Sequence, residues 1–160
     1  MGSFTEFSLP VRAFLAAYPW RRIDPVPEAP LAKPLSECRV AIVSSAGFAM
    51  PGQERFDDSI KGGDWSFREI PKDVDLAVLT ESHRSGSFDH GGIRRDPNLA
   101  FPIDRLREME RSGRIGEVAP RHFSFMGSIV APGRFLRDSV PVMAGRLVDD
   151  GVDVALLVPV

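Results

Sequence analysis

Two stretches of the chain are continuously apolar, and both predict strands that are covered on two faces. They are Arg39–Ser44 (RVAIVS) and Val152–Val160 (VDVALLVPV), and neither alternates apolar with polar side chains as a half-exposed strand does. Ser66–Ile70 does alternate and predicts an edge strand. Phe123–Met126 predicts a further short strand. Together these segments indicate a mostly parallel sheet.

Two other segments have apolar residues at helical spacing. Ile103–Glu110 predicts a helix that begins after Pro102, a favoured first position, and ends at Gly113 as a left-handed cap. Pro132–Asp149 predicts a second helix, in which Pro141 is expected to cause a kink or a split. Strand, loop, helix, helix and strand in this order are typical of a three-layer α/β sandwich, which is the fold class that we expect.

The first part of the chain has a different character. Residues 4–18 predict a short amphipathic helix interrupted by Pro10. Five prolines follow between positions 19 and 34, and each removes a backbone donor and biases the preceding residue toward an extended conformation. We therefore expect two regions. Residues 1–36 form an N-terminal helix and a proline-rich extended arm, and residues 37–160 form an α/β domain.

Composition narrows the class of protein. The net charge of −2 comes from 20 basic and 22 acidic side chains, so no global field would recruit nucleic acid or an anionic membrane. No apolar run reaches 18 residues, which argues against a conventional membrane-spanning helix. The first seven residues lack a signal-peptide pattern. A single cysteine excludes a disulfide framework and a cysteine-rich zinc site, so a cytoplasmic location is expected.

Residues 81–98 are polar, show no periodicity and hold two of the three histidines. A loop of this length without structure of its own is typical of a functional or a disordered segment. His83, Asp89 and His90 suit general acid–base chemistry, because a carboxylate fixes the orientation and tautomer of an imidazole. The same side chains could bind a metal, but their spacing matches no fixed metal motif, and we assign no metal site. A solvated loop with ion pairs and capping aspartates is the third interpretation.

The small-residue turn Ser44-Ser45-Ala46-Gly47 follows the first buried strand. In a doubly wound sheet such a turn lies at the carboxyl end of the strand, where ligands bind. A plain tight turn is the alternative, because no glycine fingerprint follows. His122 is flanked by aromatic residues, and we expect it to be a hydrogen-bonded, half-buried side chain. Cys38 directly precedes a buried strand and is expected to act as a small hydrophobe rather than as a reactive thiolate.

Several longer strings resemble one protein family. They are PWRRIDP at 19–25, KPLSECRV at 33–40, FREIP at 67–71, DPN at 96–98, FPIDRL at 101–106 and APRHFSFMG at 119–127. In this order, from about residue 18 to the last residue, they are similar to the glycine/sarcosine/betaine reductase selenoprotein B family, which includes D-proline reductase-like proteins.

The resemblance implies a subunit of an oxidoreductase that reductively cleaves an activated C–N bond of a small amino acid or amine. It implies a partner subunit whose pyruvoyl group binds the substrate amine, a selenocysteine or cysteine nucleophile, and a dithiol protein as reductant. A selenol suits this role because it is ionised at neutral pH and leaves easily. His83, Asp89 and His90 match a histidine-rich string of the family and become candidate supporting residues. The substrate-binding candidates are Ser44, Ser45, Gly47, Asp96 and Asn98.

The chain departs from the family pattern in two places. Its middle loop reads HRSGSFDH, which is two residues longer and one histidine shorter than the family's string. In family members the strand that resembles Val152–Val160 is followed by selenocysteine or cysteine and then by a second cysteine. We therefore expect residue 161 to be a selenocysteine whose UGA codon was read as a stop, the C-terminal part of the sheet to be missing, and the 160-residue chain alone to be inactive. A non-catalytic binding or assembly subunit and a small-molecule binding module are the alternatives.

Overall fold

The computed structural model describes residues 4–18, 22–86 and 88–160. The chain divides into two compact units, residues 1–30 and 31–160. In the first unit a 3-10 turn, Phe4–Glu6, precedes helix α1, Leu9–Ala17. Pro10 lies in the first turn of α1, where its missing N–H group has no partner to lose, so it starts the helix and does not interrupt it. Residues 22–34 form neither helix nor strand.

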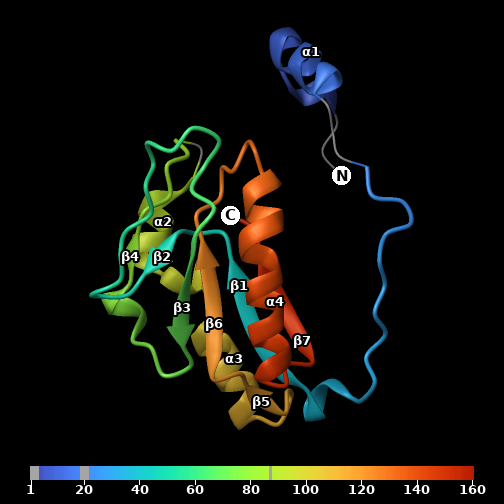
Figure 1. Ribbon diagram of the computed structural model, residues 1–160, viewed down its shortest axis with the longest axis vertical. Helices are drawn as coiled ribbons and strands as arrows, with labels where there is room; N and C mark the ends of the chain where they lie inside the picture. The colour runs from blue at the N-terminus through green and yellow to red at the C-terminus, as the bar shows by residue number, and fades with distance from the viewer. Residues whose placement is uncertain (1–3, 19–21, 87) are drawn as a thin grey trace. The chain divides into compact units, whose positions relative to one another are not determined.

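The second unit is built on a curled, mostly parallel sheet (Figure 1). Strand β1, Arg39–Ser44, lies in the middle. Strands β5, Glu117–Val118, and β6, Arg121–Phe125, run parallel to it along one side, and β7, Val154–Val158, runs parallel along the other. Strand β3, Phe67–Pro71, pairs with β6 in the antiparallel sense. The predicted α/β class, the parallel sheet and the edge position of β3 are confirmed.

Helices lie against both faces of this sheet. Helix α3, Ile103–Arg111, contributes Ile103 and Leu106 to a core shared with Val40 and Ile42 of β1. It ends before Gly113, whose φ of 68° is the left-handed cap that the sequence predicted. On the other face, helix α4, Val140–Asp149, packs over β1, β6 and β7 (Figure 1).

The long predicted helix at 132–149 is split, as its internal proline suggested. A π-helical turn, Phe135–Ser139, comes first, and α4 follows with Pro141 in its first turn. Pro141 lacks the N–H group that an uninterrupted helix would use at that position, and a wider turn accommodates the change.

Strand β7 contradicts the prediction that it is buried on both faces. It is an outer strand whose other neighbour is lacking among the described residues, and Leu157 is 68% exposed. A run of apolar residues shows that a segment is hydrophobic, but it does not show whether the strand lies inside the sheet or at its edge. For this reason the sequence wrongly predicted that β7 is buried on both faces.

The polar segment 81–98 also differs from its prediction as a loop without structure. It contains helix α2, His90–Arg95, and a 3-10 turn, Pro97–Leu99. Asp89 and Asp96 cap these two elements by accepting backbone N–H groups. The two glycines of α2 have a low helix propensity, so the sequence did not predict this helix. The Asp89 cap and the burial of Ile93 stabilise it.

Shorter elements complete the unit. Strand β2, Phe48–Ala49, pairs antiparallel with β4, Thr80–Glu81, in a separate two-stranded sheet. Two further 3-10 turns lie at Leu35–Glu37 and Leu76–Val78. Within the described ranges, no helix is long and apolar enough to cross a membrane.

Candidate functional site

Four segments meet at the carboxyl end of β1. The turn after β1 binds the end of β7, because the N–H group of Val160 donates to Ser45 Oγ over 3.0 Å. It binds the segment after β6 through the N–H group of Gly127, which donates to Ser45 O over 2.8 Å. It binds the segment after β4 through the N–H group of Ser82, which donates to Gly47 O over 3.0 Å. The fold therefore places the small-residue turn, the histidine segment and the end of the last strand at one edge of the sheet.

A pocket of about 320 Å³ opens beside this junction, and two histidines and a glutamate line it. Glu81 holds both histidines with one carboxylate. Its Oε1 accepts the backbone N–H group of His83, and its Oε2 lies 2.8 Å from His90 Nδ1. The other ring nitrogen of His90 lies 3.2 Å from Ser85 O. The hydrogen bond to Glu81 raises the pKa of His90 above its ordinary value.

His83 is the more enclosed of the two histidines, with 7% of its surface exposed. Its Nδ1 accepts the N–H group of Ser85 over 3.2 Å, so in the neutral ring the proton lies on Nε2. That Nε2 atom is buried and has no hydrogen-bond partner among the described residues. Burial lowers the pKa of His83, and its ring stacks on Phe88 at 4.3 Å between centroids. The site thus contains a neutral imidazole with an unused N–H donor.

The unused donor of His83 faces the backbone of Gly127. A Cβ at position 127 would lie 2.6 Å from His83 Nε2 and 3.1 Å from Ser45 O. Only a glycine at position 127 allows the His83 ring to lie so close to the backbone, because a Cβ atom there would overlap the imidazole ring. His83 is therefore packed directly against the junction at the end of β1.

Asp89 takes a different place from the one that acid–base chemistry would require. Its carboxylate accepts the N–H group of Gly92 over 2.8 Å as the cap of α2, and it does not line the pocket. Glu81, which sequence reasoning missed, is the carboxylate that holds the histidines. Its position two residues before His83 was the available signal. Among the described residues no group of three histidine, cysteine or acidic side chains is placed to bind a metal.

The small-residue turn is held by its own hydroxyl groups. Ser44 is fully buried, donates to Ala100 O over 2.6 Å and accepts the N–H group of Ala46. Gly47 has a φ of 70° and would bring a Cβ to 3.3 Å from the His83 backbone nitrogen. Ser44 and Gly47 therefore shape the junction, and Ser45 joins it to Val160.

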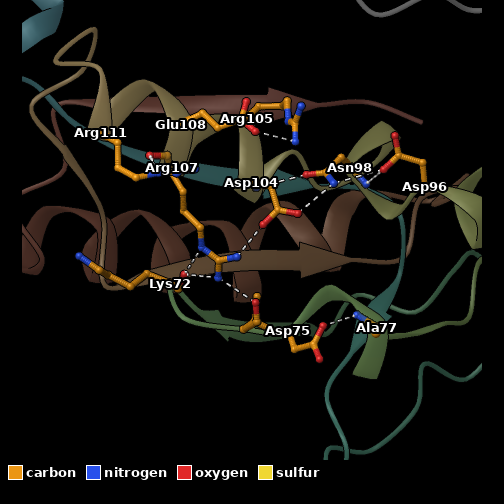
Figure 2. A network of polar contacts seen from close by, with 11 residues as sticks. Lys72, Asp75, Ala77, Asp96, Asn98, Asp104, Arg105, Arg107, Glu108 and Arg111 are labelled. Atoms are coloured by element: carbon orange, nitrogen blue, oxygen red, sulfur yellow. Dashed lines mark hydrogen bonds and ion pairs between the residues drawn. The ribbon is translucent and has the colours of Figure 1, made fainter.

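Asp96 and Asn98 belong to a separate polar network (Figure 2). Asn98 donates to carboxylates on both sides, Asp96 at 3.2 Å and Asp104 at 3.1 Å. Asp104 pairs with Arg107, which donates to the backbone carbonyl groups of Lys72 and Val74. This network fastens α3 to the segment after β3. The structure does not bring Asp96 or Asn98 into the histidine pocket.

His122 and Cys38 are both structural. His122 is fully buried, not half-buried, and its Nδ1 accepts the N–H group of Ile42 over 2.9 Å. Burial lowers the pKa of His122 to about 4. Cys38 is buried as predicted, with its Sγ 3.3 Å from Pro34 O, and it precedes the amino end of β1, opposite the end that carries the histidines.

Comparison with known proteins identifies the family. Residues 8–159 match the family model described as glycine/sarcosine/betaine reductase selenoprotein B. The chain belongs to this family. It is 37% identical over 128 residues to the D-proline reductase subunit gamma of Acetoanaerobium sticklandii. It is 28% identical over 144 residues to the sarcosine reductase complex component B subunit beta of Peptoclostridium acidaminophilum. No solved structure matches the chain.

The relatives are considerably longer than this chain. The match to the D-proline reductase subunit covers 80% of this chain and 51% of the relative. The match to the sarcosine reductase subunit covers 90% of this chain and 33% of the relative. A glycine reductase complex component B subunit gamma of Carboxydothermus hydrogenoformans, 29% identical over 150 residues, is covered to the same 33%. The chain thus spans between a third and a half of these proteins.

Proposed function

We propose that the chain is part of a reductase subunit that reductively cleaves an activated C–N bond of a small amino acid or amine. The family membership supports this proposal, since the named relatives are subunits of D-proline, sarcosine and glycine reductases. The observation that carries it is the Glu81–His83–His90 pocket at the carboxyl end of β1. This is the edge where open α/β sheets bind their ligands.

In this proposal the two histidines have separate tasks. His90 is the acid that protonates the leaving amine, because its raised pKa keeps the ring charged to higher pH. Its Nε2 proton, held by Ser85 O at 3.2 Å, is the less tightly bound of the two. His83 remains neutral and packs against Gly127, so its role is to position the wall of the pocket beside His90. Glu81 keeps both rings in place.

The residues of this chain do not fit the role of the nucleophile. Cys38 is the single cysteine, and it is buried beside Pro34 away from the histidines. In the family chemistry a selenol or thiol supplies the attacking group, and a pyruvoyl group on a partner subunit holds the amine. A dithiol protein supplies the electrons. We therefore assign acid–base and positioning roles to the chain and no step to these groups.

The test is activity of the assembled complex. The chain is purified with its partner subunits from its native host, and amine or ring-opened product is measured with D-proline, glycine, sarcosine and betaine as substrates and dithiothreitol as reductant. We expect turnover with one of them, and His90→Gln to lower kcat by about 100-fold. Arg105→Gln, an exposed change on α3, is the matched control. Normal turnover by the His90 variant would refute the acid role.

The burial of Cys38 favours a second candidate, a non-catalytic assembly subunit of the same fold. In that case substitution of either histidine leaves turnover unchanged, while removal of the chain dissociates the complex. The same purified complex distinguishes the two functions.

A further inference from the structure

We propose that a second cavity, distinct from the histidine pocket, binds an oxyanion with two negative charges, of the phosphate type. The cavity has a volume of about 450 Å³. Its lining includes three basic side chains, Lys61, Arg134 and Arg137, and no acidic one.

The walls of the cavity are built by close contacts between two segments distant in sequence. The N–H group of Ala131 donates to Gly62 O over 3.0 Å. Gly62 and Gly63 both have positive φ, 93° and 105°, and a Cβ on Gly63 would lie 2.7 Å from Ile129 Cα. Ser139 donates to the backbone carbonyl group of Trp65. These contacts fix the glycine turn against the segment that follows β6, so the basic side chains project from a firm frame.

The charges in the cavity are only partly compensated, by the carboxylate of Asp138 near Arg137 and Arg134. Within the described ranges, neither Lys61 nor Arg134 forms an ion pair. Arg134 instead lies over the Trp65 ring, 4.5 Å from its centroid. Arg137 pairs with its neighbour Asp138 at 2.7 Å, where both side chains are well exposed and the pair is weak. At least two positive charges thus face a common space.

A helical run begins at residue 133, at the rim of the cavity, and continues to the end of α4. The first N–H groups of a helix have no carbonyl partner within it. The guanidinium groups of Arg134 and Arg137 and the ammonium group of Lys61, next to the positive end of this helix, match the charge of a phosphate group. A monoanionic carboxylate would leave part of this charge unpaired, so the dianion is the better fit.

The experiment uses the fluorescence of Trp65, which lines the cavity. The chain has one other tryptophan, Trp20, and Trp20→Phe isolates the signal. Inorganic phosphate and glycerol 3-phosphate are titrated separately at constant ionic strength. We expect a saturable change in the millimolar range or below. Tighter binding of the ester than of inorganic phosphate would identify a phosphorylated metabolite as the source, and the reverse order would identify free phosphate.

Matched variants distinguish specific binding of phosphate in the cavity from a nonspecific effect of charge. We expect Lys61→Gln and Arg134→Gln each to weaken phosphate binding by about 10-fold, because each removes a charged donor. Arg105→Gln changes the net charge equally on α3, where Arg105 pairs with Glu108, and should change the affinity less than two-fold. Equal losses in all three variants, or a signal that sodium chloride reproduces, would overturn the proposal. The thermal unfolding curve of each variant verifies that the fold is retained.

Discussion

At the scale of single residues, His122 shows how a side chain replaces a missing bond of the sheet. Strands β5 and β6 follow one another along the same side of β1 but are interrupted at Ala119 and Pro120. The N–H group of Ile42 donates instead to His122 Nδ1. Because a buried N–H group without a partner is costly, this histidine stabilises the sheet independently of any activity of the protein.

His122 should also make the stability of the chain depend on pH. Its folded pKa of about 4 lies below the ordinary 6.5, so the unfolded state binds the proton more readily. The contribution of the neutral His122 to the unfolding free energy is therefore fully present above pH 6.5. It is lost as the pH falls through 4, and the total loss is about 3 kcal/mol. Urea unfolding at pH 7 and pH 4.5 measures this.

His122→Asn is the variant that separates the two roles of this residue. Asparagine can keep an acceptor for the Ile42 N–H group and does not titrate, so we expect a smaller loss of stability on acidification. If the unfolding free energy of the variant differs between pH 7 and pH 4.5 as much as that of the unchanged chain, groups other than His122 cause the acid sensitivity. His122→Ala at pH 7 should cost about 1–3 kcal/mol for the unpaired N–H group, plus the cost of the cavity.

Glu81 offers a second test at this scale. The pKa of His90 is raised chiefly by the hydrogen bond to Glu81, so Glu81→Gln should lower that pKa toward its ordinary value. The stability that the charged His90 contributes is present below the unfolded pKa and lost as pH rises through the folded pKa. NMR titration of the imidazole resonances measures the shift, with Glu108→Gln on α3 as the control. A His90 pKa that does not change would contradict the pairing.

At the scale of elements, the site depends on how closely the segment after β6 approaches the one after β4. Gly127 lies between His83 Nε2 and Ser45 O, and its N–H group is already used by Ser45. Arg84 reinforces the same region by donating to Ser128 O over 2.8 Å. The elements thus converge through backbone contacts that tolerate little added volume.

Gly127→Ala tests this convergence. The new methyl group would lie 2.6 Å from His83 Nε2, so His83 must move, and we expect a loss of about 1–3 kcal/mol in unfolding free energy. Gly145→Ala in α4 is the matched control, because a Cβ there meets nothing within 4 Å and should stabilise the helix by up to about 1 kcal/mol. Chemical denaturation of both variants measures the effects. Equal stability of the Gly127 variant and the unchanged chain would refute the close approach.

At the scale of the whole molecule, the α4 side of the sheet is incompletely covered. An apolar cavity of about 330 Å³ lies between α4 and strands β1, β6 and β7. Met143 is the buried residue of α4, while Leu157 on β7 is 68% exposed. A free edge strand with exposed leucines is prone to association.

The isolated 160-residue chain should therefore bind an apolar dye and associate in solution. Leu157→Lys places a charge on the exposed strand and should reduce both dye fluorescence and the associated fraction in size-exclusion chromatography. Leu99→Lys is the matched control, since Leu99 is 60% exposed but lies outside this region. A monomer that binds no dye, or an equal effect of both lysines, would contradict the prediction.

The sequence by itself determined the elements whose signals are local. Strands β1, β3 and β6, helix α3 with its cap at Gly113 and the proline-split helix followed from periodicity and from the chemistry of proline and glycine. The family was also readable from ordered strings. These features depend on residues that are close in sequence, so no knowledge of the topology was required.

Only the tertiary structure decided which side chains meet. The pairing of Glu81 with His90, the capping role of Asp89 and the network around Asn98 depend on where the chain turns in space. The exposure of β7 depends on its place at the outside of the sheet, which its own apolar residues do not encode. A local pattern records what each residue prefers, whereas a site is made by contacts between segments that only the complete fold brings together.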